Sequence, residues 1–236
     1  MKVQTFFSLL ALTSMLACSD NIKNNTLPQT TFLYNFESDM EGWKVAYSDY
    51  PVDSTQHSIY ELDKKHTSLP TNLTPNTKGI MVTGHNRSDD LFMYLKRQLI
   101  GLKPNQTYQF SFKVTLASQY PLNSVGIGGS PGASVYLKGG ANQEEPTNKV
   151  ATDNFLRNTW DIGSQSNAGS NTVLLGTIGI DGDEVVYKRI QRSNTAKFTA
   201  KTDANGKIWV CVGTDSGYEG KTTLYYDSIE IIAQEI

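Results

Sequence analysis

The chain has 236 residues and a formal net charge of −2, with acidic and basic side chains interspersed. These values exclude the basic footprint of a nucleic-acid-binding protein, so no nucleic acid is expected as a partner. The hydrophobic fraction of 38% suffices for a core, and the 12 Tyr and 9 Phe residues favour strands. Nineteen Gly and eight Pro residues along the chain suit many tight turns. Length and composition are typical of a single all-β domain.

The N-terminus has the features of an export signal. Lys2 precedes an apolar run at residues 6–12, which is too short to span a bilayer as a helix. The sequence Met15-Leu16-Ala17-Cys18 follows, and it resembles the lipobox of bacterial lipoproteins. The resemblance implies acylation of Cys18 and a lipid anchor in the bacterial cell envelope, in the outer membrane. An ordinary secretory signal with an incidental cysteine is the alternative.

This resemblance divides the chain into three parts. We expect residues 1–17 to be a lipoprotein signal peptide and residues 32–236 to be one folded domain. Residues 18–31 are polar and have no apolar period, so they are expected to form a flexible tether. If Cys18 carries the lipid, Cys211 has no partner in the chain and is expected to be a buried free thiol.

Apolar runs separated by turn residues predict strands along the whole domain. The clearest is at residues 108–116, where aromatic and aliphatic side chains alternate with polar ones, as in a strand with one buried face. Residues 92–99 are expected to pair with it across a turn at 101–105. The sequence Asp203-Ala204-Asn205-Gly206 predicts a hairpin turn. The other expected strands lie at residues 32–36, 43–47, 58–62, 79–83, 133–138, 172–180, 185–190, 196–200, 207–212 and 222–233.

This pattern contains no amphipathic helix of ordinary length and no fixed-period repeat. Many short strands with regular turn signals are typical of a β-sandwich or jelly roll, because a strand pair alone is not stable. Residues 142–171 interrupt the pattern with mostly polar and small side chains. Long loops of this kind are usually functional or mobile, so this segment is the first place to look for a site.

Three pieces of the sequence together suggest a fold family. They are Asn35-Phe36-Glu37 with Glu41-Gly42-Trp43, residues 99–108, and residues 224–231. Together they resemble the galactose-binding-like jelly rolls, which include many carbohydrate-binding modules. The resemblance implies that the first and last strands lie together and that a structural calcium ion is held near their ends. Residues 118–194 are much longer than the corresponding part of such a module, which indicates an irregular insertion.

The last strand offers a second reason to expect calcium. Asp227 is in period-two register with the apolar residues Tyr225, Ile229 and Ile231, and a carboxylate that faces a core needs a cation or several donors. Calcium accepts carboxylate and carbonyl oxygens, and the resemblance places Glu37 beside Asp227 as a second ligand. The alternative is that backbone amides bond to Asp227 at the end of a strand.

The sequence contains one short motif that could indicate catalysis, and its match is incomplete. Glu37-Ser38-Asp39-Met40-Glu41 resembles the catalytic strand of laminarinase-like retaining glycosidases, which need two carboxyl groups about 5 Å apart. Ser38 stands where that family has an aliphatic residue, and Gly42-Trp43 favours a turn, so no catalytic residue is assigned. The acidic stretch at residues 181–184 lacks the ligand spacing of an EF-hand and is expected to be a solvated tip. His57, His66 and His85 show no ligand spacing and are expected at the surface.

Sugar binding needs exposed aromatic rings that stack on pyranose faces, and polar side chains that bond to hydroxyl groups. The candidate rings are Tyr120, Tyr136 and Trp160, and the candidate polar partners are Asn142, Gln143 and Asp161. The alternative for each ring is packing in a core or hairpin, which is what we expect for Trp43 and Trp209.

Taken together, these features predict an envelope lipoprotein whose β-sandwich binds a carbohydrate without catalysis. The second hypothesis is a structural or adhesive lipoprotein that binds a protein partner. The third is a polysaccharide-cleaving enzyme on the same kind of sandwich.

Overall fold

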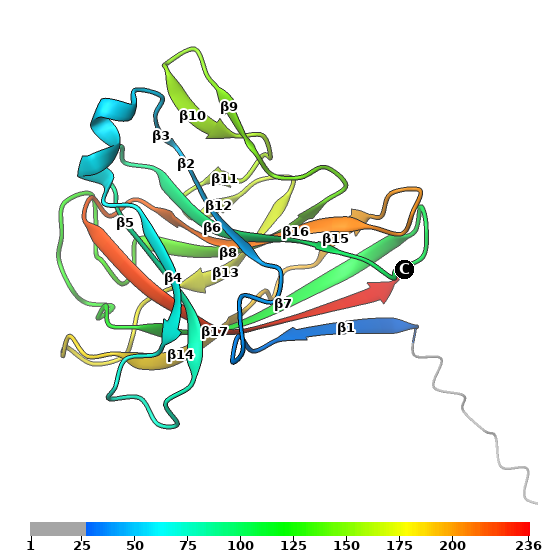
Figure 1. Ribbon diagram of the computed structural model, residues 1–236, viewed down its shortest axis with the longest axis horizontal. Coiled ribbons are helices and arrows are strands. Elements are labelled where there is room, and N and C mark those ends of the chain that lie inside the picture. Colours follow the sequence, from blue (N-terminus) through cyan, green and yellow to red (C-terminus); the bar gives the residue numbers. More distant parts are fainter. Residues whose placement is uncertain (1–26) are drawn as a thin grey trace, which may run out of the picture.

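The computed structural model describes residues 27–236 (Figure 1). The predicted signal peptide and the lipidation site at Cys18 lie outside these residues. The first strand, β1 (Gln29–Tyr34), begins three residues before the expected start of the domain, because Gln29, Thr30 and Thr31 pair with the end of the last strand, β17 (Lys221–Glu235). The expected pairing of the first and last strands is therefore confirmed.

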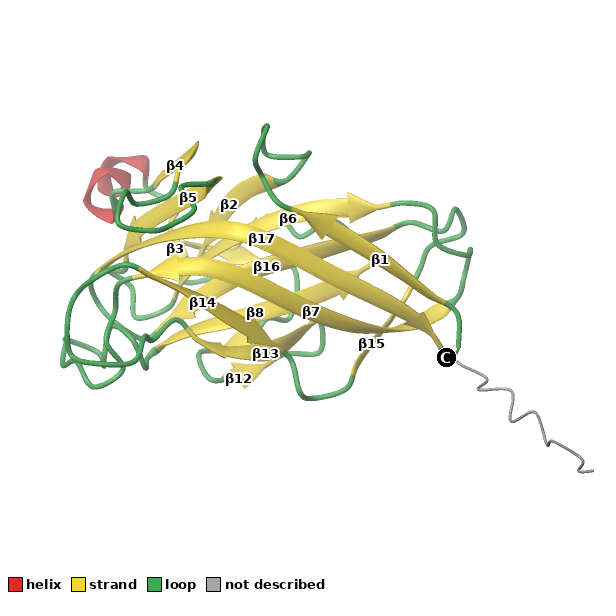
Figure 2. Ribbon diagram, turned by 90° about the horizontal axis from the view of Figure 1, so that it is seen from below, coloured by secondary structure: helices red, strands yellow, loops and turns green. Residues whose placement is uncertain are grey.

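The fold is a sandwich of two antiparallel sheets, as predicted. The first sheet has the order β14-β7-β17-β5-β4, with β1 also paired to β17 and β15 also paired to β7; the second has the order β13-β8-β16-β6-β2. The long strands β7 and β17 run side by side through the first sheet (Figure 2). The bounds of the remaining strands are β2 (Lys44–Ser48), β4 (Asp63–Ser68), β5 (Lys78–His85), β6 (Leu91–Leu99), β7 (Thr107–Ser118), β8 (Val135–Asn142), β13 (Thr172–Thr177), β14 (Lys188–Ser193), β15 (Phe198–Lys201) and β16 (Ile208–Ser216).

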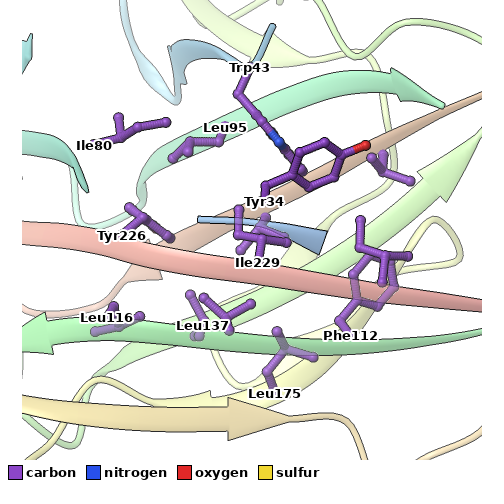
Figure 3. Close-up of a cluster of buried hydrophobic side chains, with 14 of the residues drawn as sticks. Tyr34, Trp43, Ile80, Leu95, Phe112, Leu116, Leu137, Leu175, Tyr226 and Ile229 are labelled. Carbon is purple, nitrogen blue, oxygen red and sulfur yellow. The ribbon is translucent and has the colours of Figure 1, made fainter. Parts of the chain in front are cut away.

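The core fills the space between the sheets. The inward side chains of β7 alternate as predicted, and Phe110, Phe112 and Leu116 are fully buried. They meet residues of the opposite sheet such as Leu137, while Trp43 packs edge-on against Tyr34 (Figure 3). None of the helices among the described residues is long and apolar enough to cross a membrane.

The predicted pairing of residues 92–99 with residues 108–116 is wrong, since β6 and β7 belong to opposite sheets. The turn at residues 101–105 carries the chain across the sandwich, and the turn at residues 203–206 does the same between β15 and β16. The two turns bond to each other, because Leu102 N donates to Gly206 O and Asn105 N donates to Asp203 O. The turn positions were predicted correctly, but turn chemistry alone does not distinguish a hairpin from a crossing between sheets.

Two elements near the N-terminus differ from what the sequence indicated. Residues 58–62 do not form a strand; most of them belong to the 3-10 helix η1 (Ser54–Tyr60), which Asp53 caps by accepting a hydrogen bond from Thr55 N. The neighbouring strand β4 was not predicted because its sequence, DKKHTS, is polar, as an exposed edge strand can be.

The long insertion covers the outer face of the second sheet. It contains β9 (Asn148–Val150) and β10 (Phe155–Asn158), which form a small sheet with β3 (Tyr50–Pro51), and the short hairpin β11 (Gly163–Ser164) to β12 (Asn167–Ala168). Trp160 and Ile162 pack on Phe92, Tyr94 and Cys211 of the second sheet. Cys211 is buried and free, as predicted.

Candidate functional site

A surface hollow of about 480 Å³ lies between the β3–η1 segment and the turn that joins β9 to β10. This volume is in the range of small-molecule sites. One wall contains Pro51, Val52, Asp53 and Gln56, and the other contains Asp153, Asn154 and Phe155.

Backbone hydrogen bonds fix the two walls to each other although they are about a hundred residues apart in the chain. Phe155 pairs with Pro51, and Val52 N donates to Asn154 O at 2.9 Å. The turn itself is closed by Asn154 N, which donates to Ala151 O at 3.1 Å. Asn154 adopts a positive φ of 61°, a conformation that asparagine tolerates better than most residues. The hollow is thus built from rigid segments.

Phe155 supplies an aromatic surface to the hollow. Its ring is half-buried, and the guanidinium carbon of Arg157 lies 4.9 Å from the ring centroid. This cation–π contact holds the ring in place. Together with Val52, which is 39% exposed, Phe155 makes part of the hollow apolar.

Two carboxylates supply the polar part. Asp53 accepts hydrogen bonds from the hydroxyl and backbone N–H of Thr55, at 2.8 and 3.0 Å, and these bonds lower the pKa of Asp53. Asp153 accepts from Arg157 Nη2 at 2.8 Å, which lowers the pKa of Asp153. Both groups are exposed, so they present charge to the hollow at neutral pH.

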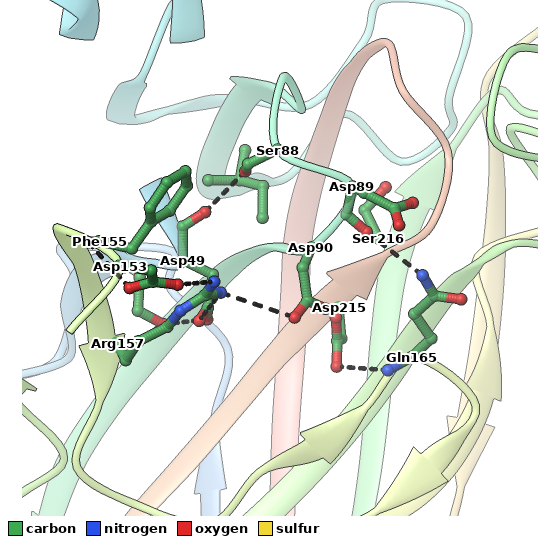
Figure 4. A network of polar contacts seen from close by, with 12 residues as sticks. Asp49, Ser88, Asp89, Asp90, Asp153, Phe155, Arg157, Gln165, Asp215 and Ser216 are labelled. Carbon is green, nitrogen blue, oxygen red and sulfur yellow. Dashed lines mark hydrogen bonds and ion pairs between the residues drawn. The ribbon is translucent and has the colours of Figure 1, made fainter. Parts of the chain in front are cut away.

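Arg157 connects the hollow to a polar network behind it (Figure 4). Its Nη1 donates to Asp49 Oδ1 at 2.9 Å and lies 3.8 Å from Asp90 Oδ2. Asp49 is buried and also accepts from the Ser48 hydroxyl at 2.9 Å. Burial raises the pKa of Asp49, and the hydrogen bonds to Arg157 and Ser48 oppose that rise.

The network ends in an ion pair that is fully inside the protein. Lys138 Nζ lies 2.7 Å from Asp215 Oδ2, and both side chains are at most 1% exposed. Lys138 also donates to the carbonyls of Ile162 and Asn167, at 2.9 and 3.0 Å, and Gln165 N donates to Asp215 Oδ2 at 2.9 Å. The pair therefore ties the β11–β12 hairpin to the second sheet.

Asp90 places a second carboxyl group close to Asp215 (Figure 4). Burial, and then the charge of Asp215, raise the pKa of Asp90 to about 8. Asp215 Oδ1 is buried and accepts no hydrogen bond from an N–H or hydroxyl group of residues 27–236. With a pKa of about 8, Asp90 is mostly protonated at neutral pH.

The three aromatic residues that were predicted to stack on a sugar do not line this hollow, and their rings are mostly packed against other residues. Trp160 is only 4% exposed and donates from Nε1 to Glu144 O at 3.0 Å, so the prediction that it stacks on a sugar is corrected: it is a core residue of the insertion. The Tyr120 hydroxyl accepts from Thr223 N at 2.7 Å, and its ring packs against the main core, which likewise gives it a structural role. Tyr136 is half-buried on the outer face of β8.

Two of the predicted polar partners do come together. Asn142 and Gln143 line a second hollow of about 210 Å³ with Ser170, Asn171 and Lys201, but no aromatic residue lines it. Asp161 shapes the adjacent loop by accepting from Ser170 N at 2.8 Å and Gly163 N at 3.2 Å. These bonds lower the pKa of Asp161. The six predicted residues therefore do not form one site.

The residues predicted to bind calcium are already engaged. Asp227 lies in a β-bulge between Tyr226 and Ser228, so it leaves the buried register of Ile229 and faces outward, contrary to the prediction. Its Oδ2 accepts from Arg189 Nε at 2.9 Å. Glu37 is exposed and accepts from Lys78 N at 3.3 Å.

A cation beside Asp227 would meet the guanidinium of Arg189, so these residues do not fit a calcium ion well. Across residues 27–236, no three His, Cys, Asp or Glu side chains converge as metal ligands. Calcium binding stays a prediction that these contacts do not support.

The motif at residues 37–41 forms a turn, as expected. Glu41 Oε1 accepts from the backbone N–H groups of Asn35 and Phe36, at 2.9 and 2.7 Å. Asp39 accepts from Glu41 N. These carboxylates stabilise the turn and do not line a strand as a catalytic set.

The residues of the larger hollow carry no clear signal in the sequence. Phe155 is an isolated apolar residue in a polar segment, and Asp153-Asn154 beside it is an ordinary turn signal. The wall that contains Asp53 becomes relevant only through the pairing of β3 with β10, which no local pattern indicates.

No family model and no curated protein matches the chain. The solved structures with some similarity include the K1 cleaved adhesin domain of Lys-gingipain from Porphyromonas gingivalis W83, with 14% identity, a TM-score of 0.37, and coverage of 86% of this chain and 97% of that one. They also include TmCBM27, a carbohydrate-binding module described for mannan recognition, with 9% identity, a TM-score of 0.39, and coverage of 88% and 99%. The enzymatically active domain of tailspike protein 4 from bacteriophage CBA120 has 9% identity and a TM-score of 0.36 over 86% of this chain, which spans only 20% of that chain. At these values the similarities carry no information on ligands.

Proposed function

We propose that the protein binds a carbohydrate in the hollow between β3–η1 and the β9–β10 turn. The observation that carries this proposal is a half-buried aromatic ring, Phe155, beside the ionised carboxylates of Asp53 and Asp153 in one hollow. A pyranose has an apolar face of C–H groups and a rim of hydroxyl groups, and this combination of side chains matches both.

Binding in this hollow needs little rearrangement. Phe155 is held by Arg157, Asp53 is held by the first turn of η1, and the two walls are hydrogen-bonded to each other. A preorganised site loses less conformational entropy when the ligand binds. The carboxylates accept hydrogen bonds from sugar hydroxyls, and the ring stacks on the C–H face.

The proposal is one of binding without catalysis. A retaining glycosidase uses two accessible carboxyl groups about 5 Å apart. Asp215 is fully buried and paired with Lys138, so Asp90 and Asp215 do not supply such a pair.

We also propose that the protein is anchored to the bacterial envelope through Cys18, on the strength of its lipobox-like sequence. With β1 beginning at Gln29, the tether would be residues 19–28, which span at most about 35 Å when extended.

A protein partner is a second candidate function. The loop between β7 and β8 exposes three apolar side chains, Leu122, Val125 and Ile127, and Val125 is 95% exposed. Exposed apolar patches are common at protein interfaces.

A glycan array tests the main proposal. The mature chain with Cys18 replaced by serine would be applied in calcium and again in EDTA, beside the Phe155→Ala variant. We expect specific binding in both buffers and its loss in the variant. An array without hits for the parent protein would contradict the proposal. The protein-partner hypothesis would then be tested by pull-down experiments that compare the parent protein with variants of the apolar loop between β7 and β8.

A further inference from the structure

We infer that the hollow selects neutral or amino-bearing saccharides and rejects acidic ones such as uronates and sulfated sugars. This inference rests on the proposed carbohydrate binding. It concerns the charge and hydrogen-bonding character of the walls.

The hollow has negative charge on both walls. Asp53 lies on one and Asp153 on the other, and the bonds described above keep both ionised. None of the seven lining residues, all within the described chain, is Lys, Arg or His. An anionic ligand would therefore enter between two like charges.

Arg157 does not offset this charge. Its guanidinium is divided between Asp49 and Asp153, at 2.9 and 2.8 Å, and it also lies over one face of the Phe155 ring. One cation thus serves two carboxylates, and Asp53 forms no ion pair with any residue in the range 27–236. To bind an anionic sugar, Arg157 would have to leave partners that hold the β9–β10 turn.

The hydrogen-bonding groups lead to the same conclusion. Some donors around the hollow are used, since the Thr55 N–H, the Thr55 hydroxyl and one N–H of the Gln56 amide donate to Asp53. The Phe155 N–H donates to Asp153 at 3.2 Å. Hydroxyl and ammonium groups of a sugar would find two carboxylates as acceptors here, whereas carboxylates and sulfates accept only and would depend on the neutral side-chain amides of Gln56 and Asn154.

The size of the selectivity can be worked out from the repulsion between an anionic ligand and the two exposed carboxylates in water. At contact distance in high dielectric, one like charge weakens binding by up to about fivefold and two like charges by up to about thirtyfold. The Debye length falls from about 10 Å at 0.1 M salt to about 3 Å at 1 M, so the selectivity should shrink as salt is added.

The test compares matched ligands on the full mature chain with Cys18 replaced by serine. The probes are neutral oligosaccharides of glucose, mannose and galactose, and the same oligosaccharides oxidised at C6 to uronates. We expect the oxidised form of a binding oligosaccharide to bind at least fivefold more weakly at 50 mM salt, with a smaller difference at 0.5 M.

Two variants link the effect to the named residues. Asp53→Asn keeps a good helix N-cap and should raise the affinity for the oxidised form about threefold relative to the affinity for the neutral form. Asp153→Asn releases one side of Arg157 and should improve it more, about tenfold. Asp183→Asn, at the exposed tip after β13, removes the same charge elsewhere and should change neither.

The outcomes separate the two proposals. Tighter or equal binding of the oxidised form at 50 mM salt would overturn the charge selectivity and leave carbohydrate binding intact. Failure of every neutral and oxidised probe to bind would overturn both.

Discussion

Replacing Lys138 by methionine should destabilise the protein by about 3–5 kcal/mol. Lys138 and Asp215 are at most 1% exposed, so removal of the ammonium group leaves a carboxylate charge without its cation inside the protein. The carbonyls of Ile162 and Asn167 lose a donor in the same step. Because total stabilities are about 5–15 kcal/mol, the loss should be a large part of the whole.

Urea unfolding, followed by tryptophan fluorescence, measures this loss. The double variant Lys138→Met/Asp215→Leu removes both charges and should recover most of the lost stability, since well-packed apolar pairs often replace buried ion pairs without cost. Lys113→Met is the matched control, because the Lys113–Glu230 pair is 46% and 24% exposed and should contribute no more than about 1 kcal/mol. A Lys138→Met variant within about 1 kcal/mol of the parent protein, or a double variant as unstable as the single one, would refute the reasoning.

Three further predictions follow from the same contacts. Trp160→Ala should cost about 3–5 kcal/mol in urea unfolding, because the ring is buried, and a loss under 1 kcal/mol would contradict a core role. Asp90 holds a proton in the folded protein between about pH 4 and 8, where the unfolded chain has released it, so stability should fall as pH rises through this window. Asp90→Asn should flatten that slope, and an unchanged slope would count against the raised pKa of Asp90. The melting temperature should be the same in calcium and in EDTA, since Arg189 already neutralises Asp227, and a rise of several degrees in calcium would show that a site was overlooked.

Much of the fold was predictable because burial leaves a period-two pattern in the sequence. The strand β7 alternates without interruption, and its inward side chains are buried as expected. The pairing of β6 with β7 was not predictable from their turn, because the bonds that orient this turn come from a second turn a hundred residues away. The bulge at Asp227 also leaves no signal in the sequence. Strict alternation predicts that the Asp227 carboxylate points inward, but the bulge shifts the register by one residue, so the carboxylate points outward to Arg189.

The candidate site was harder to predict than the fold. Trp160 and Tyr120 were chosen because aromatic rings in an irregular segment are good candidates for stacking. The insertion uses Trp160 as an anchor on the second sheet, so its ring is covered. Phe155 is the aromatic residue that lines a hollow, and the opposite wall comes from β3 and η1. Folding brings this wall to the insertion through the pairing of β3 with β10, which lies about a hundred residues later in the chain.

The affinity of an array-selected oligosaccharide for the mature chain, measured by isothermal titration calorimetry, tests the central claim most directly. The account predicts that Phe155→Ala weakens binding at least tenfold, while Tyr136→Ala, a half-buried ring outside the hollow, leaves the affinity within about twofold. Both variants should be compared at equal folded fraction, checked by urea unfolding. Unchanged affinity in Phe155→Ala, or loss only in Tyr136→Ala, would contradict the account and move the binding site away from the hollow.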